Sequence, residues 1–359
     1  MTYANSAQWA RSNIMVNIKI NGRSLKVAEG TTILDAALQN GIVIPTLCKH
    51  AKLSPFGGCR MCLVEVEGTR KLFTGCTTPV WDDVSVITHS ERLQGIRRTV
   101  VELMISDHPN DCMTCDKAGA CDLQAMAYEY GVRDVRFKGE RRKYDKRDGN
   151  PFIERDMEKC VMCGRCVKAC DEIQGVGAID FSYRGFKSKV TPPYERDLNC
   201  EFCGQCVAVC PTGALMDKSS SGKAREGVRK VNTTCSYCGT GCNLTLHVKD
   251  NQVVRVTSPA GSINEGWLCV KGRFGYGFLN SGDRLAEPMI RKNGDLVPVS
   301  WDEAIAYTAK RLMEIKKKHG PDALAGLSSA RCTNEDNYLF QKLFRAVVGT
   351  NNVDHCARL

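Results

Sequence analysis

Cysteine is the feature that most restricts how this chain can fold, because the sequence holds 21 cysteines and most of them stand two or three residues apart in tight groups. Small secreted domains use cysteine for disulfides. This chain is long, with 359 residues, and its N-terminus has neither an apolar signal segment nor twin arginines. Metal ligation is therefore the better interpretation of the cysteines, and a cytoplasmic protein is expected.

Charge and hydropathy argue against two other classes of protein. The mean hydropathy is −0.28, and no long uncharged apolar run would form a membrane span. The net charge of +10 could indicate a nucleic-acid partner, but no zinc-finger spacing or recognition-helix pattern accompanies it. Five oxidised iron–sulfur clusters, one with a neutral histidine ligand, would add roughly −9. The basic excess then needs no polyanion, and no nucleic acid is expected.

Residues 16–93 hold the first group of cysteines. Apolar residues alternate on both sides of Asn21-Gly22 and predict a β-hairpin, and Thr32 with Asp35 forms a capping-box pattern that predicts a helix start. The spacing C-x10-C-x2-C-x13-C follows, made by Cys48, Cys59, Cys62 and Cys76. This order resembles a plant-type [2Fe–2S] ferredoxin, and the long first gap resembles the N-terminal domain of the large iron–sulfur subunit of respiratory complex I. One [2Fe–2S] cluster is implied, with structural zinc as the alternative.

Residues 94–140 hold the second group. An amphipathic helix is predicted over 90–106, with one apolar face made by Leu93, Ile96, Val100, Leu103 and Met104. Next come four residues at ligand spacing, His108, Cys112, Cys115 and Cys121. This pattern resembles complex I's large subunit and iron-only hydrogenases, and it implies a [4Fe–4S] cluster with one imidazole ligand. The remaining histidines are expected to be solvated surface residues, namely His50, His89, His247, His319 and His355.

Residues 141–219 carry the most specific pattern. A polar, basic stretch at 133–150 reads as a linker. Two runs of C-x2-C-x2-C-x3-C follow, as in bacterial two-cluster ferredoxins, where the fourth cysteine of each run ligates the other cluster. One [4Fe–4S] cluster is therefore expected on Cys160, Cys163, Cys166 and Cys210. The other is expected on Cys200, Cys203, Cys206 and Cys170. Zinc is a weak alternative here.

Residues 228–283 contain a fourth type of group, made by Cys235, Cys238, Cys242 and Cys269. With the following Val270-Lys271-Gly272, it resembles the N-terminal [4Fe–4S] domain of molybdenum and tungsten bis-pterin oxidoreductases. The resemblance implies that Lys271 lies between the cluster and the pterin and helps to carry the electron. Cys332 and Cys356 remain outside all five sets and are expected to be buried or inert thiols.

Residues 284–359 change character. Ser300 with Glu303 predicts a helix over about 301–318, residues 323–327 read as a buried strand, and residues 334–348 as another helix. This is the start of an α/β domain. The stretch from Ser328 to Leu359, above all GTNNVD followed by CARL, resembles the catalytic subunits of formate dehydrogenases.

The expected fold class is α+β multidomain. Its parts are an N-terminal tail at 1–15, a β-grasp [2Fe–2S] ferredoxin-like domain at 16–93, a helical domain at 94–140 whose cluster has one histidine and three cysteine ligands, a two-cluster bacterial-ferredoxin domain at 141–219, the [4Fe–4S] domain of bis-pterin oxidoreductases at 228–283 and an incomplete bis-pterin domain at 284–359. The implied cofactors are one [2Fe–2S] cluster, four [4Fe–4S] clusters and a Mo or W bis-pterin guanine dinucleotide.

The resemblance over residues 16–359 implies the alpha subunit of a formate dehydrogenase, which interconverts formate and carbon dioxide and passes two electrons along iron–sulfur clusters. A non-catalytic electron-transfer subunit like the large iron–sulfur subunit of NADH:quinone oxidoreductase is the alternative. An iron-only hydrogenase is rejected, because the Cys235–Cys269 group stands where its active-site cysteines would be. No G-x-G-x-x-G occurs. Flavin- and iron–sulfur-containing partner subunits, linked to NAD(P), ferredoxin or a hydrogenase, are therefore expected.

The end of the sequence gives one further expectation. In formate dehydrogenases of this kind, the residue after C-A-R-L is the metal ligand, a selenocysteine or a cysteine. Since UGA encodes selenocysteine and is otherwise read as a stop, we expect a UGA codon after Leu359 and an open frame beyond it. The 359 residues alone would then carry electrons without oxidising formate.

Overall fold

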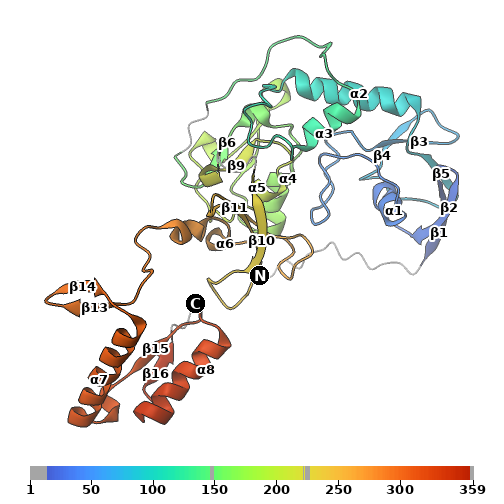
Figure 1. The fold of residues 1–359 in the computed structure, drawn as a ribbon. Coiled ribbons are helices and arrows are strands. Elements are labelled where there is room, and N and C mark those ends of the chain that lie inside the picture. Colours follow the sequence, from blue (N-terminus) through green and yellow to red (C-terminus); the bar gives the residue numbers. More distant parts are fainter. Residues whose placement is uncertain (1–13, 146–148, 221, 223–226, 356–359) are drawn as a thin grey trace. The chain divides into compact units, whose positions relative to one another are not determined.

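A computed structural model describes residues 14–145, 149–220, 222 and 227–355 (Figure 1). Contacts divide the chain into two units, Met1–Gly227 and Val228–Leu359, which we describe separately. Across the described ranges, no helix combines the length and the apolar character needed to cross a membrane.

The first unit begins with a five-stranded sheet of order β2-β1-β5-β3-β4. Its strands are β1 (Met15–Ile20), β2 (Arg23–Ala28), β3 (Leu63–Val66), β4 (Leu72–Thr74) and β5 (Val84–Ile87). The predicted hairpin is confirmed, since Ile20 pairs with Arg23 across a two-residue turn. Asn21 and Gly22 both have positive φ, 52° and 77°, as a turn that matches the twist of the strands requires.

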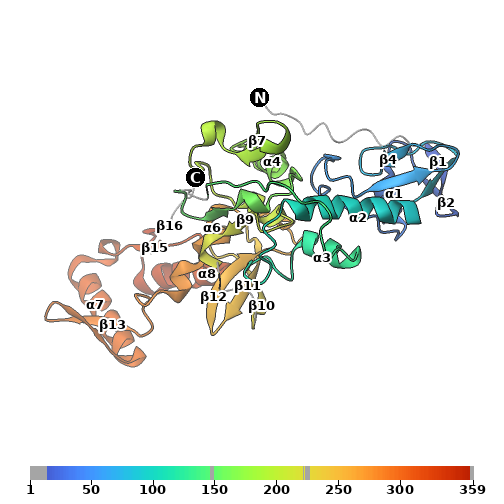
Figure 2. The same ribbon diagram turned by 90° about the horizontal axis from the view of Figure 1, so that it is seen from above.

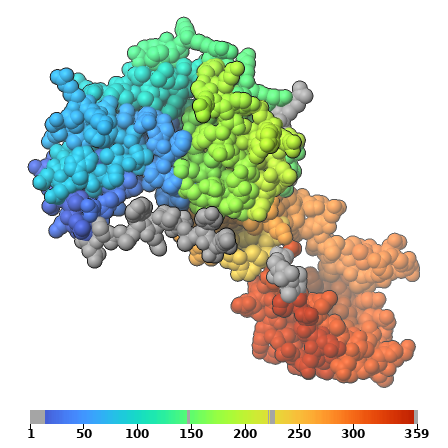
Figure 3. Space-filling model, turned by 180° about the vertical axis from the view of Figure 1, so that it is seen from behind, coloured from blue at the N-terminus to red at the C-terminus, as the bar shows by residue number. Residues whose placement is uncertain are grey.

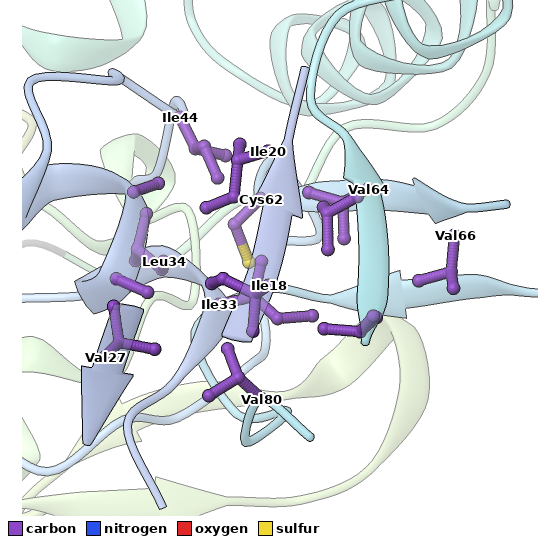
Figure 4. Close-up of a cluster of buried hydrophobic side chains, with 14 of the residues drawn as sticks. Ile18, Ile20, Val27, Ile33, Leu34, Ile44, Cys62, Val64, Val66 and Val80 are labelled. Carbon is purple, nitrogen blue, oxygen red and sulfur yellow. The ribbon is translucent and has the colours of Figure 1, made fainter. Parts of the chain in front are cut away.

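One helix, α1 (Ile33–Gln39), covers this sheet and closes its apolar core (Figure 4). The predicted cap is confirmed, because the Thr32 hydroxyl accepts the Asp35 amide at 3.1 Å. Ile33 and Leu34 have no exposed surface, and they pack with Ile18, Val64 and other apolar residues. Cys62 and Cys76 belong to the same core, so two of the predicted ligands lie among its apolar side chains.

Two helices follow, α2 (Glu91–Ser106) and α3 (Asp122–Glu129). The range predicted for α2 is confirmed, and its predicted face is confirmed in part, since Leu93 is buried and Val100 and Met104 pack against a buried cluster. Leu93, Arg97 and Val101 are buried, whereas Leu103 is 50% exposed. The prediction missed Arg97 on the buried side, where its guanidinium donates to the carbonyls of Met61, Leu63 and Thr88 at 3.1, 2.9 and 2.9 Å. These bonds turn an arginine toward the sheet, and apolar periodicity could not reveal them.

Short elements surround the next eight cysteines. The strands form two antiparallel pairs, β6 (Ile153–Arg155) with β9 (Leu215–Asp217) and β7 (Asp180–Ser182) with β8 (Lys189–Thr191). The helices are η1 (Met157–Lys159), α4 (Arg165–Lys168), η2 (Ala169–Ile173), η3 (Gly185–Lys187), η4 (Pro193–Glu195), α5 (Gln205–Val209) and η5 (Lys218–Ser220). Gly164 and Gly204, both left-handed, precede α4 and α5. The two cysteine runs therefore enter their short helices in the same way.

This segment packs against the N-terminal sheet domain within the first unit. Phe56 stacks on Phe181 with ring centroids 5.4 Å apart, and the Ser54 amide donates to Glu172 at 2.8 Å. Figure 3 shows the blue and yellow-green surfaces of the two segments adjoining. The loop before Cys59 is thereby fixed to the helix that carries Cys166 and Cys170.

The second unit begins with a three-stranded antiparallel sheet, β10 (Arg229–Thr234), β11 (Asn243–Lys249) and β12 (Gln252–Thr257), seen side by side in Figure 2. Two helices follow, α6 (Val270–Phe274) and η6 (Gly275–Asn280). The expectation of a solvated His247 is wrong. This residue lies on the central strand, is only 4% exposed, and its Nε2 lies 2.9 Å from the Thr257 hydroxyl.

The last segment contains a hairpin and two strand–helix steps. Its elements are β13 (Met289–Lys292), β14 (Asp295–Pro298), α7 (Trp301–His319), η7 (Pro321–Ala323), β15 (Gly326–Ser328), α8 (Asn334–Lys342), η8 (Leu343–Val348) and β16 (Val353–His355). The two predicted helices are confirmed. The buried strand predicted at 323–327 forms instead at Gly326–Ser328, because its position is set by parallel pairing with the distant β16. It is not fully buried, since Leu327 is 80% exposed.

Candidate metal centres

The first cysteine set lies in and beside the core of the N-terminal sheet domain. Cys48, Cys59, Cys62 and Cys76 are all buried. Amide groups point at the sulfurs, as shown by the Leu47 amide 3.4 Å from the Cys59 sulfur. Gly58 is required beside this loop, because a Cβ there would lie 2.4 Å from the Phe56 ring. The four sulfurs with their amide donors match the donor set of a [2Fe–2S] cluster.

The thiols of this set interact directly with one another. Hydrogen bonds from Cys59 and Cys76 hold the pKa of Cys48 well below its usual range. A hydrogen bond from Cys76 lowers the pKa of Cys62 to about 7. Cys48 and Cys62 therefore hold their thiolates most readily, and thiolate is the form that binds metal.

The His108 set combines a buried imidazole with three cysteines of different exposure. His108 is 7% exposed, and its Nε2 is buried without a hydrogen-bond partner among the described residues. Burial lowers the pKa of His108, which favours the neutral, metal-binding form. Cys115 is buried, Cys121 is partly buried and Cys112 is exposed. Gly213 lies so close that a Cβ there would come within 2.9 Å of the Cys115 sulfur.

Eight cysteines line two separate cavities, and the structure exchanges the fourth members of the two runs. The first cavity is lined by Cys160, Cys163, Cys166 and Cys210, and the second by Cys170, Cys200, Cys203 and Cys206. Apolar residues complete both walls, among them Met157, Val190 and Leu215. These are the two groupings that the spacing predicts.

These cysteines are poor acids while no metal is bound. Burial raises the pKa of Cys160 to about 11, and the pKa values of Cys163 and Cys206 to about 12. Metal binding at neutral pH must therefore release protons. No three His, Cys, Asp or Glu side chains of the described ranges lie close enough together for one metal ion. The cysteines enclose volumes instead, and a cluster whose separate irons each take one thiolate would occupy such a volume.

The last set lies in the second unit and is more open. Cys235 is buried, Cys242 is partly buried, and Cys238 and Cys269 are exposed. The Cys235 amide donates to the Cys242 carbonyl at 2.8 Å. Burial raises the pKa of Cys235, and the Cys269 and Cys238 thiols add to the rise. Lys271 lies on α6, two residues after Cys269, and is exposed.

Cysteine spacing gave no indication of the cations beside these sets. Arg142 donates to the carbonyl of Cys160 at 3.1 Å and to that of Ser188 at 3.2 Å, and pairs with Asp107. The Lys159 ammonium lies 3.0 Å from Asp111, next to the His108 set. The basic stretch at 133–150 was the available signal for Arg142, but nothing in its composition distinguished this residue. Cys332 is exposed, and Cys356 lies outside the described residues.

Family models match the chain in five consecutive segments. In order, they describe a 2Fe-2S iron-sulfur cluster binding domain (13–91), an NADH-ubiquinone oxidoreductase-G iron-sulfur binding region (97–136), the ferredoxin-like domain of NADH-quinone oxidoreductase subunit 3 (150–216), a molybdopterin oxidoreductase Fe4S4 domain (228–281) and a molybdopterin oxidoreductase (284–359). The predicted fold class is confirmed, including the start of a molybdopterin domain.

Curated relatives match nearly the whole chain. The NADPH-Fe(3+) oxidoreductase subunit alpha of Geobacter sulfurreducens is 46% identical over 350 residues, which are 96% of this chain and 40% of that protein. A G-type subunit of the NADH-quinone oxidoreductase of Rhizobium meliloti is 41% identical over 96% of this chain and 40% of its own length. A provisionally named formate dehydrogenase of Staphylococcus aureus is 31% identical over 95% of this chain and 39% of its own length. The chain thus spans about 40% of the length of these relatives.

One solved structure matches the fold over much of its length. A chain of an NAD+-reducing [NiFe]-hydrogenase, crystallised in the H2-reduced state, has a TM-score of 0.55 and 30% identity. The match covers 58% of this chain and 89% of that one.

Proposed function

Since the chain carries the iron–sulfur domains and the start of the molybdopterin domain of the molybdopterin oxidoreductases, we propose that it conducts electrons between a metal–pterin site and a nucleotide-linked partner. The observation that carries the proposal is the exchange of Cys170 and Cys210 between two cavities. Two cavities with four cysteines each suit two [4Fe–4S] clusters, which are one-electron carriers.

The proposed ligands follow the five sets described above. A [2Fe–2S] cluster is bound by Cys48, Cys59, Cys62 and Cys76. Four [4Fe–4S] clusters are bound by His108, Cys112, Cys115 and Cys121; by Cys160, Cys163, Cys166 and Cys210; by Cys200, Cys203, Cys206 and Cys170; and by Cys235, Cys238, Cys242 and Cys269. Lys271 is proposed to lie on the electron path to the pterin. Iron and acid-labile sulfide should each approach about 18 per chain.

Substitution of Cys170 tests the exchange directly. In Cys170→Ser, the spectrum of the cluster in the second cavity should be lost or converted, while the cluster of the Cys160 run persists. Cys332→Ser, at an exposed cysteine outside all sets, is the matched control. Loss confined to the cluster of the Cys160 run would overturn the assignment.

Formate is the substrate we propose for the metal site, with molybdenum or tungsten as the metal and formate ⇌ CO2 + H+ + 2 e− as the reaction. Support comes from the run GTNNVD at 349–354 and from the relative named as a formate dehydrogenase. β16 begins in this run and is parallel to β15, and ligands of such sheets bind beyond the carboxyl ends of the strands. The partners proposed are flavin- and iron–sulfur-containing subunits in the cytoplasm, linked to NAD(P), ferredoxin or a hydrogenase.

A second candidate is transfer of electrons from NADPH or NADH without formate chemistry. The higher identities favour it, since the relatives at 46% and 41% are named for NADPH and NADH. The two candidates differ in what reduces the clusters. In the full-length native protein with its partners, formate should bleach the iron–sulfur absorbance if the first candidate holds. If NADPH or NADH alone bleaches protein that lacks molybdenum and tungsten, the formate proposal is wrong and the second candidate replaces it.

A further inference from the structure

An open, basic hollow lies beside the two cysteine cavities of the first unit. Its volume is about 720 Å3, within the range of small-molecule sites. It is lined by residues of the linker and of the segment around η3, namely Glu140, Arg141, Arg142, Lys143, Tyr144, Tyr183, Phe186, Lys187, Lys189 and Glu195. Five cations thus face two carboxylates.

The floor of the hollow is fixed by a polar and aromatic network. The Lys189 ammonium lies 2.6 Å from Glu195 and 5.3 and 5.5 Å from the ring centroids of Tyr144 and Tyr183. The Tyr183 hydroxyl donates to Glu195 as well. Tyr183, Tyr194 and Glu195 all have positive φ, at 64°, 56° and 55°. Side chains disfavour this backbone, and such residues gather at functional sites.

The rim of the hollow is different, because its lysines have no counter-ions among the described residues. Lys143, Phe186 and Lys187 are exposed, and no hydrogen bond or ion pair to a described residue engages the two lysines. Arg142 is paired with Asp107 and Lys189 with Glu195, so these two cations are already neutralised. The rim lysines beside an exposed ring suit a ligand that is both flat and anionic.

A second hollow shares lining residues both with this hollow and with the two cysteine cavities. The second hollow shares Tyr144, Lys189 and Glu195 with the first and reaches Met157 and Val190. Met157 and Val190 also line the cavity of Cys160 and the cavity of Cys170. Both are buried, at 7% and 3% exposure. The same two side chains therefore line the second hollow and the two cavities that hold eight cysteines, so they connect the basic hollow to those cavities through the second hollow.

We infer that this basic hollow binds a flat, anionic two-electron carrier of the quinone or flavin class, and that electrons pass between it and the two cysteine cavities by way of Met157 and Val190. The inference rests on the proposed function for the origin of the electrons. Two electrons leave, one from each cluster proposed for the two cavities, so each cluster is oxidised by one electron. A quinone takes both, with two protons from water, and becomes the hydroquinone; the reverse transfer also balances.

Binding can be tested without activity. Equilibrium dialysis of the chain against anthraquinone-2,6-disulfonate, and separately against FMN, measures affinity and distinguishes the quinone source from the flavin source. For whichever probe binds to the wild type, the dissociation constant should rise at least about tenfold in the variant Lys143→Glu/Lys187→Glu. A matched control is Lys19→Glu/Lys26→Glu, the same change of charge in a hollow of about 660 Å3 on the N-terminal sheet whose lining contains no aromatic residue. The control should bind as the wild type does.

A kinetic measurement tests whether electrons pass from the reduced chain to a probe in the basic hollow. Oxidation of the prereduced chain by the anthraquinone should slow in Lys143→Glu/Lys187→Glu, while oxidation by the cationic, non-planar hexaammineruthenium(III) should not. If neither probe binds, or if both double variants weaken binding equally, the inference fails. If the probe binds at the hollow but the chain holds no reducible clusters, the site stands and the proposed function fails.

Discussion

Cys62 and Cys76 lie without exposed surface in the apolar core of the N-terminal sheet, whereas Cys238 and Cys269 of the last set are exposed on the second unit. The first set is held rigid because two of its cysteines pack in a core that includes Ile18, Ile33 and Leu34. The last set has Cys235 in a smaller cluster with Leu244, Val256 and Leu268, and Cys242 packs against that cluster. A large core therefore holds the first site in place, while the last site has a smaller core and two exposed cysteines, so its order depends more on what it binds. Four predictions test this difference.

Removal of metal should have the largest effect. Chelation should leave amide protection of β1–β5 nearly unchanged, because that sheet has its own core. Around residues 235–274, protection should fall by about a thousandfold, or about 4 kcal/mol, since binding energy there is folding energy. Hydrogen-exchange mass spectrometry of the loaded and metal-free chains makes the comparison. Equal loss of protection in both regions would show that burial does not distinguish them.

Truncation of the core should have the next largest effect. Leu34 has no exposed surface, and Leu34→Ala should destabilise the sheet domain by about 3 kcal/mol through lost contacts and a cavity. The matched variant Leu38→Ala, at a residue 49% exposed on the same helix, should cost less than about 1 kcal/mol. Urea unfolding of the metal-free chain measures both. A similar cost for the two variants would contradict the assigned core.

The buried arginine gives a third test. Arg97→Met should destabilise the sheet domain by about 2 kcal/mol, because the carbonyls of Met61, Leu63 and Thr88 lose a charged donor. It should also lower the midpoint potential of the cluster proposed for the neighbouring cysteines, since a cation is removed. Arg92→Met, at an exposed residue paired with Glu65, should change neither quantity appreciably. An unchanged potential in Arg97→Met would limit this residue to a structural role.

The smallest effect concerns pH in the second unit. Burial lowers the pKa of His247 to about 4, whereas the unfolded chain titrates near its ordinary value of 6.5. Between these values the unfolded state binds more protons, so stability falls as the pH falls, by about 1.6 kcal/mol from pH 6.5 to pH 5. His247→Gln should remove this part of the pH dependence. Thermal melts of the loaded protein at pH 5 and pH 7 would show it, and equal slopes in both proteins would refute it.

Local signals in the sequence predicted local structure well. Asn21-Gly22 and Thr32 act within a few residues, so the turn and the cap could be read directly. The grouping of Cys170 with the Cys200 run followed from spacing, since three thiolates two residues apart leave the fourth position to a distant residue. Five segments matched family models in the predicted order.

The features that the sequence did not predict depend on contacts between residues far apart in the chain. The burial of Arg97 on α2 depends on its bonds to carbonyls 36 and 34 residues away, and the position of β15 depends on its pairing with β16. His247 looked like a surface histidine because nothing in its sequence neighbours showed that it would lie on a central strand. The basic hollow combines the linker with the segment around η3, and no spacing links the two.

The exchange of Cys170 and Cys210 has a consequence for biosynthesis. On the proposed ligands, neither of the two ferredoxin-type clusters can be completed until Cys210 or Cys200–Cys206 has left the ribosome, although Cys160 emerges long before. The N-terminal set is complete once residue 76 is out. Cofactor loading would then begin at the N-terminal sheet while the first ferredoxin run waits, with its thiols protonated, for its partner to be synthesised. The order of the chain would thus set the order in which the electron path is built.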